Sequence, residues 1–333
     1  MIFVVGNSRS GTTLMGRILG AHPQVNTFEE LHFFENLITP AAILAPPTLA
    51  PGAARALVVR LLTTARGNIF ARPDPAALGQ APDRILAEAG ADPISLYRAV
   101  LRHETLRAGK AISCEQTPRY LFSITEIRAA FPEARFINMV RDPRDVMLSQ
   151  KNKWRTYFHG SWNMPLAEAV RVWANYHPVL MAKLWSAAVR RGAAFGPAEG
   201  VLTVRFEDLL EAPQHTVAGI CDFLGIAFHP PMLAAEDIGS SAKADRPGQR
   251  GLNPTASGRW RNGGLSAREL AICHRLCARE MRAMGYDVAE LRLSGLRYMA
   301  ELPPLVVKGG LSLVLNLPRN RNVLGAIRRR FLQ

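Results

Sequence analysis

The residues that point most clearly to a chemical function form a glycine-bearing loop near the N-terminus. Gly6 and Gly11 enclose the sequence Asn-Ser-Arg-Ser. The short β-branched stretch 2–6 predicts a buried strand before the loop, and the apolar spacing of 12–20 predicts a helix after it. In this context, backbone N–H groups and the positive end of the helix bind phosphate. Further donors would be the hydroxyl groups of Ser10, Thr12 and Thr13. The loop therefore predicts an anion-binding site.

The same loop differs from that of nucleoside triphosphatases at one position. The spacing from Gly6 to Gly11 matches a Walker A loop, but Thr12 stands where that motif has lysine. Without the lysine, neutralisation of a β/γ-phosphate is missing, although Arg9 inside the loop supplies another cation. A kinase-like nucleotide enzyme is thus the less favoured alternative, and a tight turn without ligand is a third interpretation.

A second charged turn follows a predicted strand at 135–140. Arg141 stands at the end of this strand, and Ser149 lies eight residues later, about two turns into the next predicted helix. A guanidinium group and a hydroxyl group so placed could hold another phosphate at the edge of the sheet where ligands bind. Taken alone, the neighbouring Arg and Asp residues are also typical of solvated salt bridges, so the pairing with the first loop carries the interpretation.

The remaining pattern predicts an α/β fold with a mostly parallel sheet. A third strand is expected at 201–206, and helical segments, including 166–190, are expected to connect the strands. We assign 1–290 to this domain, with a helical insertion at about 38–110 that forms either a lid or acceptor-binding wall, or a purely structural subdomain. The stretch 238–262 is expected to be a long ordered loop near a ligand.

Composition excludes several classes of protein. The 333 residues are 48% hydrophobic and 20% charged, which excludes a disordered or coiled-coil chain. No uninterrupted apolar run reaches the roughly 20 residues that span a bilayer. The first residues enter the glycine loop directly, so we expect a cytoplasmic protein. Four cysteines without a CxxC pair favour buried thiols over a zinc site or disulfides.

The chain is strongly basic, with a net charge of +14. This excess favours anionic partners and raises the alternative of a non-catalytic nucleotide- or nucleic-acid-binding protein, whose binding would be salt-sensitive. We separate 291–333 as a basic amphipathic tail, since 302–333 contains six basic residues and no acid. The tail could rest on the inner face of an anionic membrane, or 311–317 could pack as a core helix.

Three motifs, taken in their order along the chain, resemble those of a known family. They are RSGTTLMGRILGAHP followed by EE, then FPEARFINMVRDPRDVMLS, then VRFEDLL with CDFLGI. Together they resemble the sulfotransferases that use 3′-phosphoadenosine 5′-phosphosulfate, in the branch of the tyrosylprotein sulfotransferases and bacterial relatives. The similarity runs from Phe3 to about Tyr286. It implies a P-loop-like three-layer fold and in-line transfer of a sulfuryl group to an acceptor hydroxyl, without a metal and without nucleic acid. The acceptor is expected to be a carbohydrate, a glycolipid or a small metabolite.

The resemblance also implies residue roles. The segment from Arg9 through Ser10, Gly11, Thr12 and Thr13 would bind the 5′-phosphosulfate, and Arg141 with Ser149 the 3′-phosphate. Over the nucleotide would lie Ser241, Arg259 and Trp260. Glu30 would be the general base, with His32 as the alternative base and Arg9 as a catalytic cation. Gln116 departs from the family, because relatives usually have lysine there to support the leaving oxygen.

Overall fold

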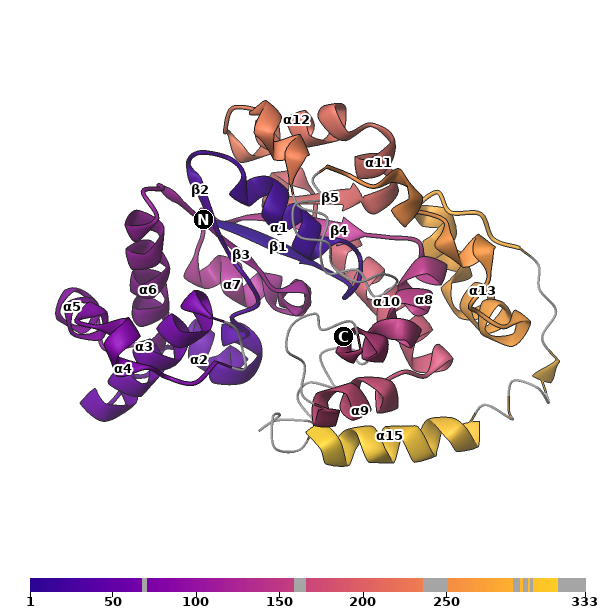
Figure 1. Cartoon of the computed structure of the whole chain (residues 1–333), viewed down its shortest axis with the longest axis horizontal. Helices are drawn as coiled ribbons and strands as arrows, with labels where there is room; N and C mark the ends of the chain where they lie inside the picture. The colour runs from indigo at the N-terminus through magenta and orange to yellow at the C-terminus, as the bar shows by residue number, and fades with distance from the viewer. Residues whose placement is uncertain are drawn as a thin grey trace.

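Five parallel strands form a single twisted sheet at the centre of the molecule (Figure 1). The computed structural model describes residues 1–67, 71–158, 166–235, 251–289, 294–295, 299 and 302–316. The strand order is β2-β3-β1-β4-β5, and each neighbouring pair is parallel. The strands are β1 (Ile2–Gly6), β2 (Val25–Phe28), β3 (Ile112–Gln116), β4 (Arg135–Val140) and β5 (Val201–Arg205). The predicted α/β class and the three predicted strands are confirmed.

Helices cover both faces of the sheet, as the three-layer prediction requires. Side chains of β1 alternate, so that Ile2 and Val4 join one apolar cluster and Phe3 and Val5 join the other. The first cluster is covered by α1 (Thr12–Gly20), α11 (Phe206–Glu211), α12 (Pro213–Leu224) and the 3₁₀ turn η6 (Pro230–Ala234). The second is covered by the 3₁₀ helix η2 (Pro118–Ser123), α7 (Ile124–Ala130) and the helices of the predicted insertion.

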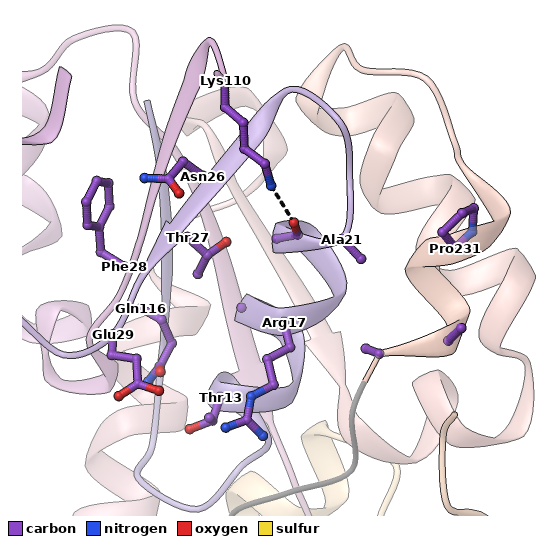
Figure 2. A pocket seen from close by; sticks show the side chains of 14 residues that line it. Thr13, Arg17, Ala21, Asn26, Thr27, Phe28, Glu29, Lys110, Gln116 and Pro231 are labelled. Atoms are coloured by element: carbon purple, nitrogen blue, oxygen red, sulfur yellow. Dashed lines mark hydrogen bonds between the residues drawn. The ribbon is translucent and has the colours of Figure 1, made fainter. Parts of the chain in front are cut away.

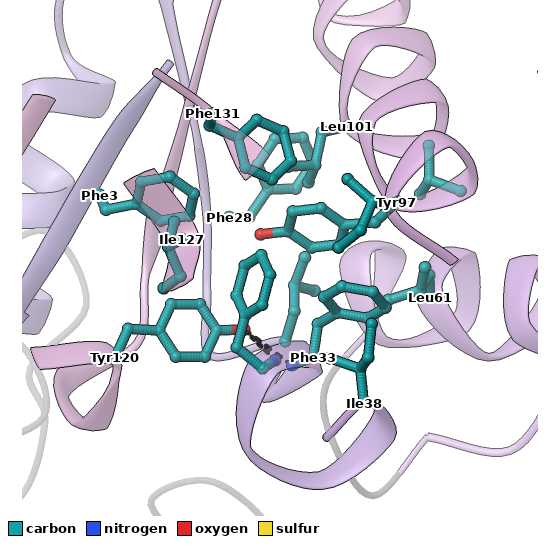
Figure 3. Close-up of a cluster of buried hydrophobic side chains, with 14 of the residues drawn as sticks. Phe3, Phe28, Phe33, Ile38, Leu61, Tyr97, Leu101, Tyr120, Ile127 and Phe131 are labelled. Carbon is teal, nitrogen blue, oxygen red and sulfur yellow. Dashed lines mark hydrogen bonds between the residues drawn. The ribbon is translucent and has the colours of Figure 1, made fainter. Parts of the chain in front are cut away.

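The described part of the predicted insertion is helical. Its helices are α2 (Pro40–Leu44), α3 (Pro51–Arg66), α4 (Pro75–Leu78), α5 (Ala81–Glu88) and α6 (Pro93–Arg107). They share one buried cluster with the sheet, in which Phe33 stacks on Tyr97 at 4.3 Å between ring centroids (Figure 3). Phe33 opens η1 (Phe33–Leu37), a short π-helix that follows β2 closely. The insertion and the segment after β2 therefore depend on the same core.

The predicted helical segment over 166–190 is confirmed, and the structure divides it into two helices. Their bounds are α9 (Leu166–Ala174) and α10 (Pro178–Ala193). Pro178 has no N–H to continue the first helix but suits the first turn of the second. The other helical elements are α8 (Pro143–Asn152), η3 (Lys153–Tyr157), η5 (Pro197–Glu199), η7 (Pro254–Ala256), η8 (Arg259–Asn262), α13 (Ala267–Ala283) and α15 (Leu302–Asn316).

Two of the remaining sequence predictions concern the cysteines and the membrane. All four cysteines are buried free thiols, as predicted. Among the residues described above, no helix combines the length and the apolar character needed to cross a membrane.

Candidate active site

The glycine loop is held in a conformation that only small residues fit. Gly6 has a φ of 142°, and a Cβ there would lie 2.3 Å from the carbonyl oxygen of Met139. Gly11 has a φ of 90°, and its Cβ would lie 2.4 Å from the ring of Phe206. Gly11 is also the N-cap of α1 and has no side chain to accept hydrogen bonds from the first-turn N–H groups. The loop thus directs these donors and the positive helix end outward.

The structure brings the two predicted phosphate motifs together. Arg9 Nε donates a hydrogen bond to Ser149 Oγ at 2.9 Å, although 140 residues separate them. Arg141 Nη1 donates to the carbonyl oxygen of Arg9 at 3.3 Å. The Arg141 guanidinium also lies 4.5 Å from the ring centroid of Phe206. The first loop and the start of α8 therefore form one positively charged site at the carboxyl end of the sheet.

A third loop, from 256 to 260, closes beside this site. Arg141 Nη2 donates to the Ala256 carbonyl oxygen at 2.5 Å. The Asp145 carboxylate accepts hydrogen bonds from the backbone N–H of Gly258 at 2.7 Å and of Trp260 at 2.9 Å. Arg259 lies close enough that its charge, together with the larger effect of burial, lowers the pKa of Arg141. Arg259 and Trp260 thus lie next to the second motif, whereas Ser241 is outside the described residues.

Two buried donors at this site are unsatisfied within the described part of the chain. They are the Ser10 hydroxyl group and Nε of Arg141, neither of which has a hydrogen-bond partner there. A buried donor without a partner is costly, and a bound phosphate or sulfate oxygen would satisfy it. Because both donors are in the two anion motifs, the residues present fit a ligand with two anionic ends. In the described ranges, no group of three or more His, Cys, Asp or Glu residues could hold a metal ion.

The predicted bases lie in a network of charges after β2. His32 Nε2 lies 3.1 Å from a Glu30 carboxylate oxygen, and Nδ1 lies 2.6 Å from Glu35 Oε2. Burial lowers the pKa of His32, but hydrogen bonds and charges of both carboxylates outweigh it and raise the pKa to about 10. An imidazolium has no lone pair to accept a proton. These contacts therefore favour Glu30 over His32 as the base.

Glu30 remains ionised in this network. Burial of its carboxyl group raises the pKa. The hydrogen bond and charge of His32, together with the charge of Lys153, outweigh burial, so the pKa lies below its usual value. Its neighbour Glu29 points elsewhere, into a cavity of about 510 Å³ beside α1 that Thr13 and Arg17 also line (Figure 2). The two carboxylates therefore alternate in direction, as expected for an extended segment.

Gln116 lies at the same cavity. Its side-chain amide donates a hydrogen bond to Thr12 Oγ1 at 3.3 Å. The amide thus orients the first residue of α1 but adds no charge there.

Comparison with known proteins identifies the family. The sequence model of the sulfotransferase family matches residues 2–230. The chain belongs to the sulfotransferase family. It is 25% identical over 243 residues to protein-tyrosine sulfotransferase 1 of Danio rerio, covering 72% of this chain and 56% of that protein. It is 28% identical over 247 residues to the nodulation protein NoeE of Sinorhizobium fredii, covering 68% and 51%. The sulfotransferase chain spans about half the length of these curated relatives.

A solved structure shares the sulfotransferase fold. The sulfotransferase domain of the Synechococcus PCC 7002 olefin synthase superposes with a TM-score of 0.55 at 20% identity, covering 87% of this chain and 95% of that one. At this identity the likeness concerns the fold alone, and it agrees with the parallel sheet and helical layers described above.

Sequence reasoning missed the residues that fix the position of Glu30 in this sulfotransferase. Buried Glu115 accepts a hydrogen bond from the backbone N–H of Leu31 at 3.2 Å. The Tyr120 hydroxyl oxygen accepts one from the N–H of Phe33 at 2.7 Å (Figure 3). Between them His32 adopts a left-handed φ of 54°. Glu115 is in the motif CEQTP, directly before Gln116, the position that departs from the family. This proximity could have identified Glu115 from the sequence.

Sequence reasoning also missed Lys153, the first residue of η3. Burial and the charge of Arg9 lower its pKa to about 8, while the charge of Glu30 acts in the opposite direction. Lys153 therefore lies within electrostatic reach of both predicted catalytic groups. Its spacing of four residues from Ser149 placed it on the same helical face, and this spacing could have identified it.

Proposed function

We propose that the chain transfers a sulfuryl group from 3′-phosphoadenosine 5′-phosphosulfate to an acceptor hydroxyl group. Membership of the sulfotransferase family supports the reaction class. The observation that carries the proposal is the junction of Arg9, Ser149 and Arg141, since it joins two anion sites on one surface. A donor with a phosphosulfate at one end and a 3′-phosphate at the other matches that arrangement.

The donor-binding roles follow the two motifs. The backbone from Arg9 to Thr13, with the hydroxyl groups of Ser10, Thr12 and Thr13, would hold the 5′-phosphosulfate at the N-terminus of α1. Arg141 and Ser149 would bind the 3′-phosphate. Arg259 and Trp260, fixed by Asp145, would cover the nucleotide, and Ser241 is proposed to join them.

The proposed catalytic roles are based on the charged side chains around Glu30 and Arg9. When bound, the donor supplies an activated sulfuryl group, and the protein has to position the acceptor and stabilise charge on the leaving oxygen. Glu30 is the proposed general base, and His32 is a positioning residue that holds its carboxylate. Arg9 and Lys153 are the proposed cations for the leaving group, which compensates for the uncharged amide of Gln116.

The acceptor class is the least constrained part of the proposal. A carbohydrate, a glycolipid or a small metabolite is proposed, with its hydroxyl group within reach of the Glu30 carboxylate. We further propose that the protein works in the cytoplasm, which is compatible with its four free thiols, and that it has no nucleic-acid partner.

Calorimetric titration with adenosine 3′,5′-bisphosphate, beside ATP with magnesium, tests the donor. We expect tight binding of the bisphosphate without metal. Arg141→Ala should weaken it by about tenfold to a hundredfold, because a charge-assisted hydrogen bond is lost. A preference for magnesium ATP would favour the kinase-like alternative. Binding of neither nucleotide, together with salt-sensitive binding of RNA or DNA, would favour a nucleic-acid-binding protein.

A further inference from the structure

Helix α15 is oriented with its polar side chains toward the protein. Lys308 lies with Nζ 4.5 Å from the ring centroid of Trp173 on α9, and it donates to the Tyr176 carbonyl oxygen at 3.3 Å. One turn later, Ser312 Oγ lies 2.5 Å from Oδ1 of Asn175. The side chains of Lys308 and Ser312 therefore contact α9 and the residues that follow it, and burial lowers the pKa of Lys308.

The opposite face of α15 presents aliphatic side chains to solvent. Val306, Val307 and Val314 are 72%, 71% and 61% exposed, and Leu311 is exposed as well. Val307, Leu311 and Val314 follow the spacing of a single helical stripe. The prediction that 311–317 might pack as a core helix is therefore wrong for Leu311 and Val314. In the described part of the chain, this exposed apolar stripe has no covering element.

A second apolar stripe borders the first. On α9 the exposed large side chains are Leu166, Val170 and Trp173, spaced four and three residues apart. Trp173 contacts Lys308 of α15, so the two helices that carry these stripes are neighbours, and both lie at the lower margin of the molecule in Figure 1. We call the seven residues of both stripes the α9–α15 face: Leu166, Val170, Trp173, Val306, Val307, Leu311 and Val314.

Charge identifies what covers this face. The sequence from 302 to 333 contains six basic residues and no acid, and five arginines come after the last residue of α15. A second copy of the chain would carry the same net charge of +14, so self-association would be opposed by repulsion. An anionic bilayer offers both an apolar layer for the aliphatic stripe and negative headgroups for the arginines.

We propose that the α9–α15 face docks on an anionic lipid bilayer, with α15 lying in the plane of the interface. This docking goes beyond the proposed sulfotransfer and does not depend on it. One consequence does rest on the proposed function: α9 packs against η3, which begins at Lys153, so docking would favour lipid-linked acceptors among the proposed classes.

Vesicle sedimentation with the full chain tests the docking. The wild-type chain is expected to bind vesicles of phosphatidylcholine with phosphatidylglycerol at least about tenfold more tightly than phosphatidylcholine alone. Val307→Asp with Val314→Asp should lower binding to the anionic vesicles by about tenfold or more. The matched control, Leu44→Asp with Leu106→Asp, changes two equally exposed leucines on α2 and α6 and should bind as wild type. Circular dichroism and thermal unfolding verify that both variants are folded.

An attached probe gives an independent reading. Because the four native cysteines are buried, a Val314→Cys variant can be labelled selectively with an environment-sensitive dye. We expect its emission to shift to the blue with anionic vesicles, and no shift for the same dye on Leu106→Cys.

Three results would overturn the docking proposal. One is unchanged vesicle binding by the Val307→Asp, Val314→Asp variant, and another is equal wild-type binding to neutral vesicles. The third is a wild-type dimer in light scattering that this variant converts to a monomer, with no vesicle binding, because a second copy would then cover the face. Binding of adenosine 3′,5′-bisphosphate is measured separately, so failure of the proposed sulfotransfer would leave these results unaffected.

Discussion

At the scale of single residues, the site separates groups that hold anions from groups that handle a proton. Arg9, Ser149 and Arg141 form the anion-binding side. Glu30 and His32 form an ion pair after β2. Lys153 is coupled electrostatically to both sides, since the charges of Arg9 and of Glu30 both shift its pKa. Substitutions on the two sides should therefore affect different steps.

The division of roles predicts how two adjacent carboxylates differ. Glu30→Gln keeps the shape but removes the proton acceptor, so kcat should fall by about 10² to 10⁴-fold while the affinity for adenosine 3′,5′-bisphosphate stays unchanged. Glu29→Gln is the matched control, because Glu29 points into the cavity and away from His32. Sulfate transfer from labelled donor and calorimetry provide the two readings. Equal kcat losses in both variants would refute Glu30 as the base.

The lowered pKa of Lys153 predicts a pH dependence. A lysine with a pKa of about 8 is charged below that pH and neutral above it, so transfer should decline as the pH rises through about 8. Lys153→Arg keeps its charge and should move this decline to higher pH, whereas Lys153→Met should be slow throughout. The measurement is kcat across pH 6 to about 10 for the three proteins. An identical alkaline decline in Lys153→Arg would exclude Lys153 as its source.

At the scale of elements, the base is positioned by the core and not by its own loop. The segment carrying Glu30 donates backbone hydrogen bonds to the carboxylate of Glu115, near the end of β3, and to the hydroxyl oxygen of Tyr120 in η2. Burial raises the pKa of Glu115 to about 7, which reflects how far this carboxyl group lies from solvent. The aromatic cluster around Phe33 then holds η1 against the insertion helices (Figure 3).

Removing the Tyr120 hydroxyl group tests this positioning. Tyr120→Phe leaves the buried N–H of Phe33 without its acceptor, so stability should fall by about 1 to 3 kcal/mol. kcat should fall more than the bisphosphate affinity, because η1 and Glu30 shift while the glycine loop does not. Thr105→Val, which removes another buried hydrogen bond, to Ser113 at 2.8 Å, is the control for stability alone. A kcat loss of the same size in both variants would contradict a positioning role.

The sequence predicted elements well where local pattern and burial agree. β1 is a continuous apolar run, β4 is mostly apolar and buried after its first residue, and both lie in the interior of the sheet. β2 and β3 were missed because VNTF and ISCEQ carry polar residues that tertiary contacts satisfy, such as Glu115. The anion motifs could be predicted because each depends on a few residues in a row. The protonation of His32 could not, since it depends on the geometry of Glu30 and Glu35 around the ring.

At the scale of the whole molecule, the anion site lies where the apolar clusters meet. Phe206 belongs to the cluster that covers one face of the sheet, whereas Val140 and Val146 belong to a separate cluster between α8, α10 and α13. Arg141 follows Val140 and contacts the Phe206 ring, so it connects the two clusters. A ligand bound to both anion motifs would hold them together.

Ligand-dependent unfolding tests this connection. A ligand that binds only the folded chain at about 100 times its Kd adds about 2.7 kcal/mol of stability. For a chain of 333 residues, adenosine 3′,5′-bisphosphate should therefore raise the Tm by about 4 °C in one cooperative transition. Arg141→Ala should lower the Tm without ligand and lose most of the increase, because it contacts both sides of the site. If the bisphosphate instead stabilised only one of two separate transitions, the clusters would be independent and the ligand would bind to one of them alone.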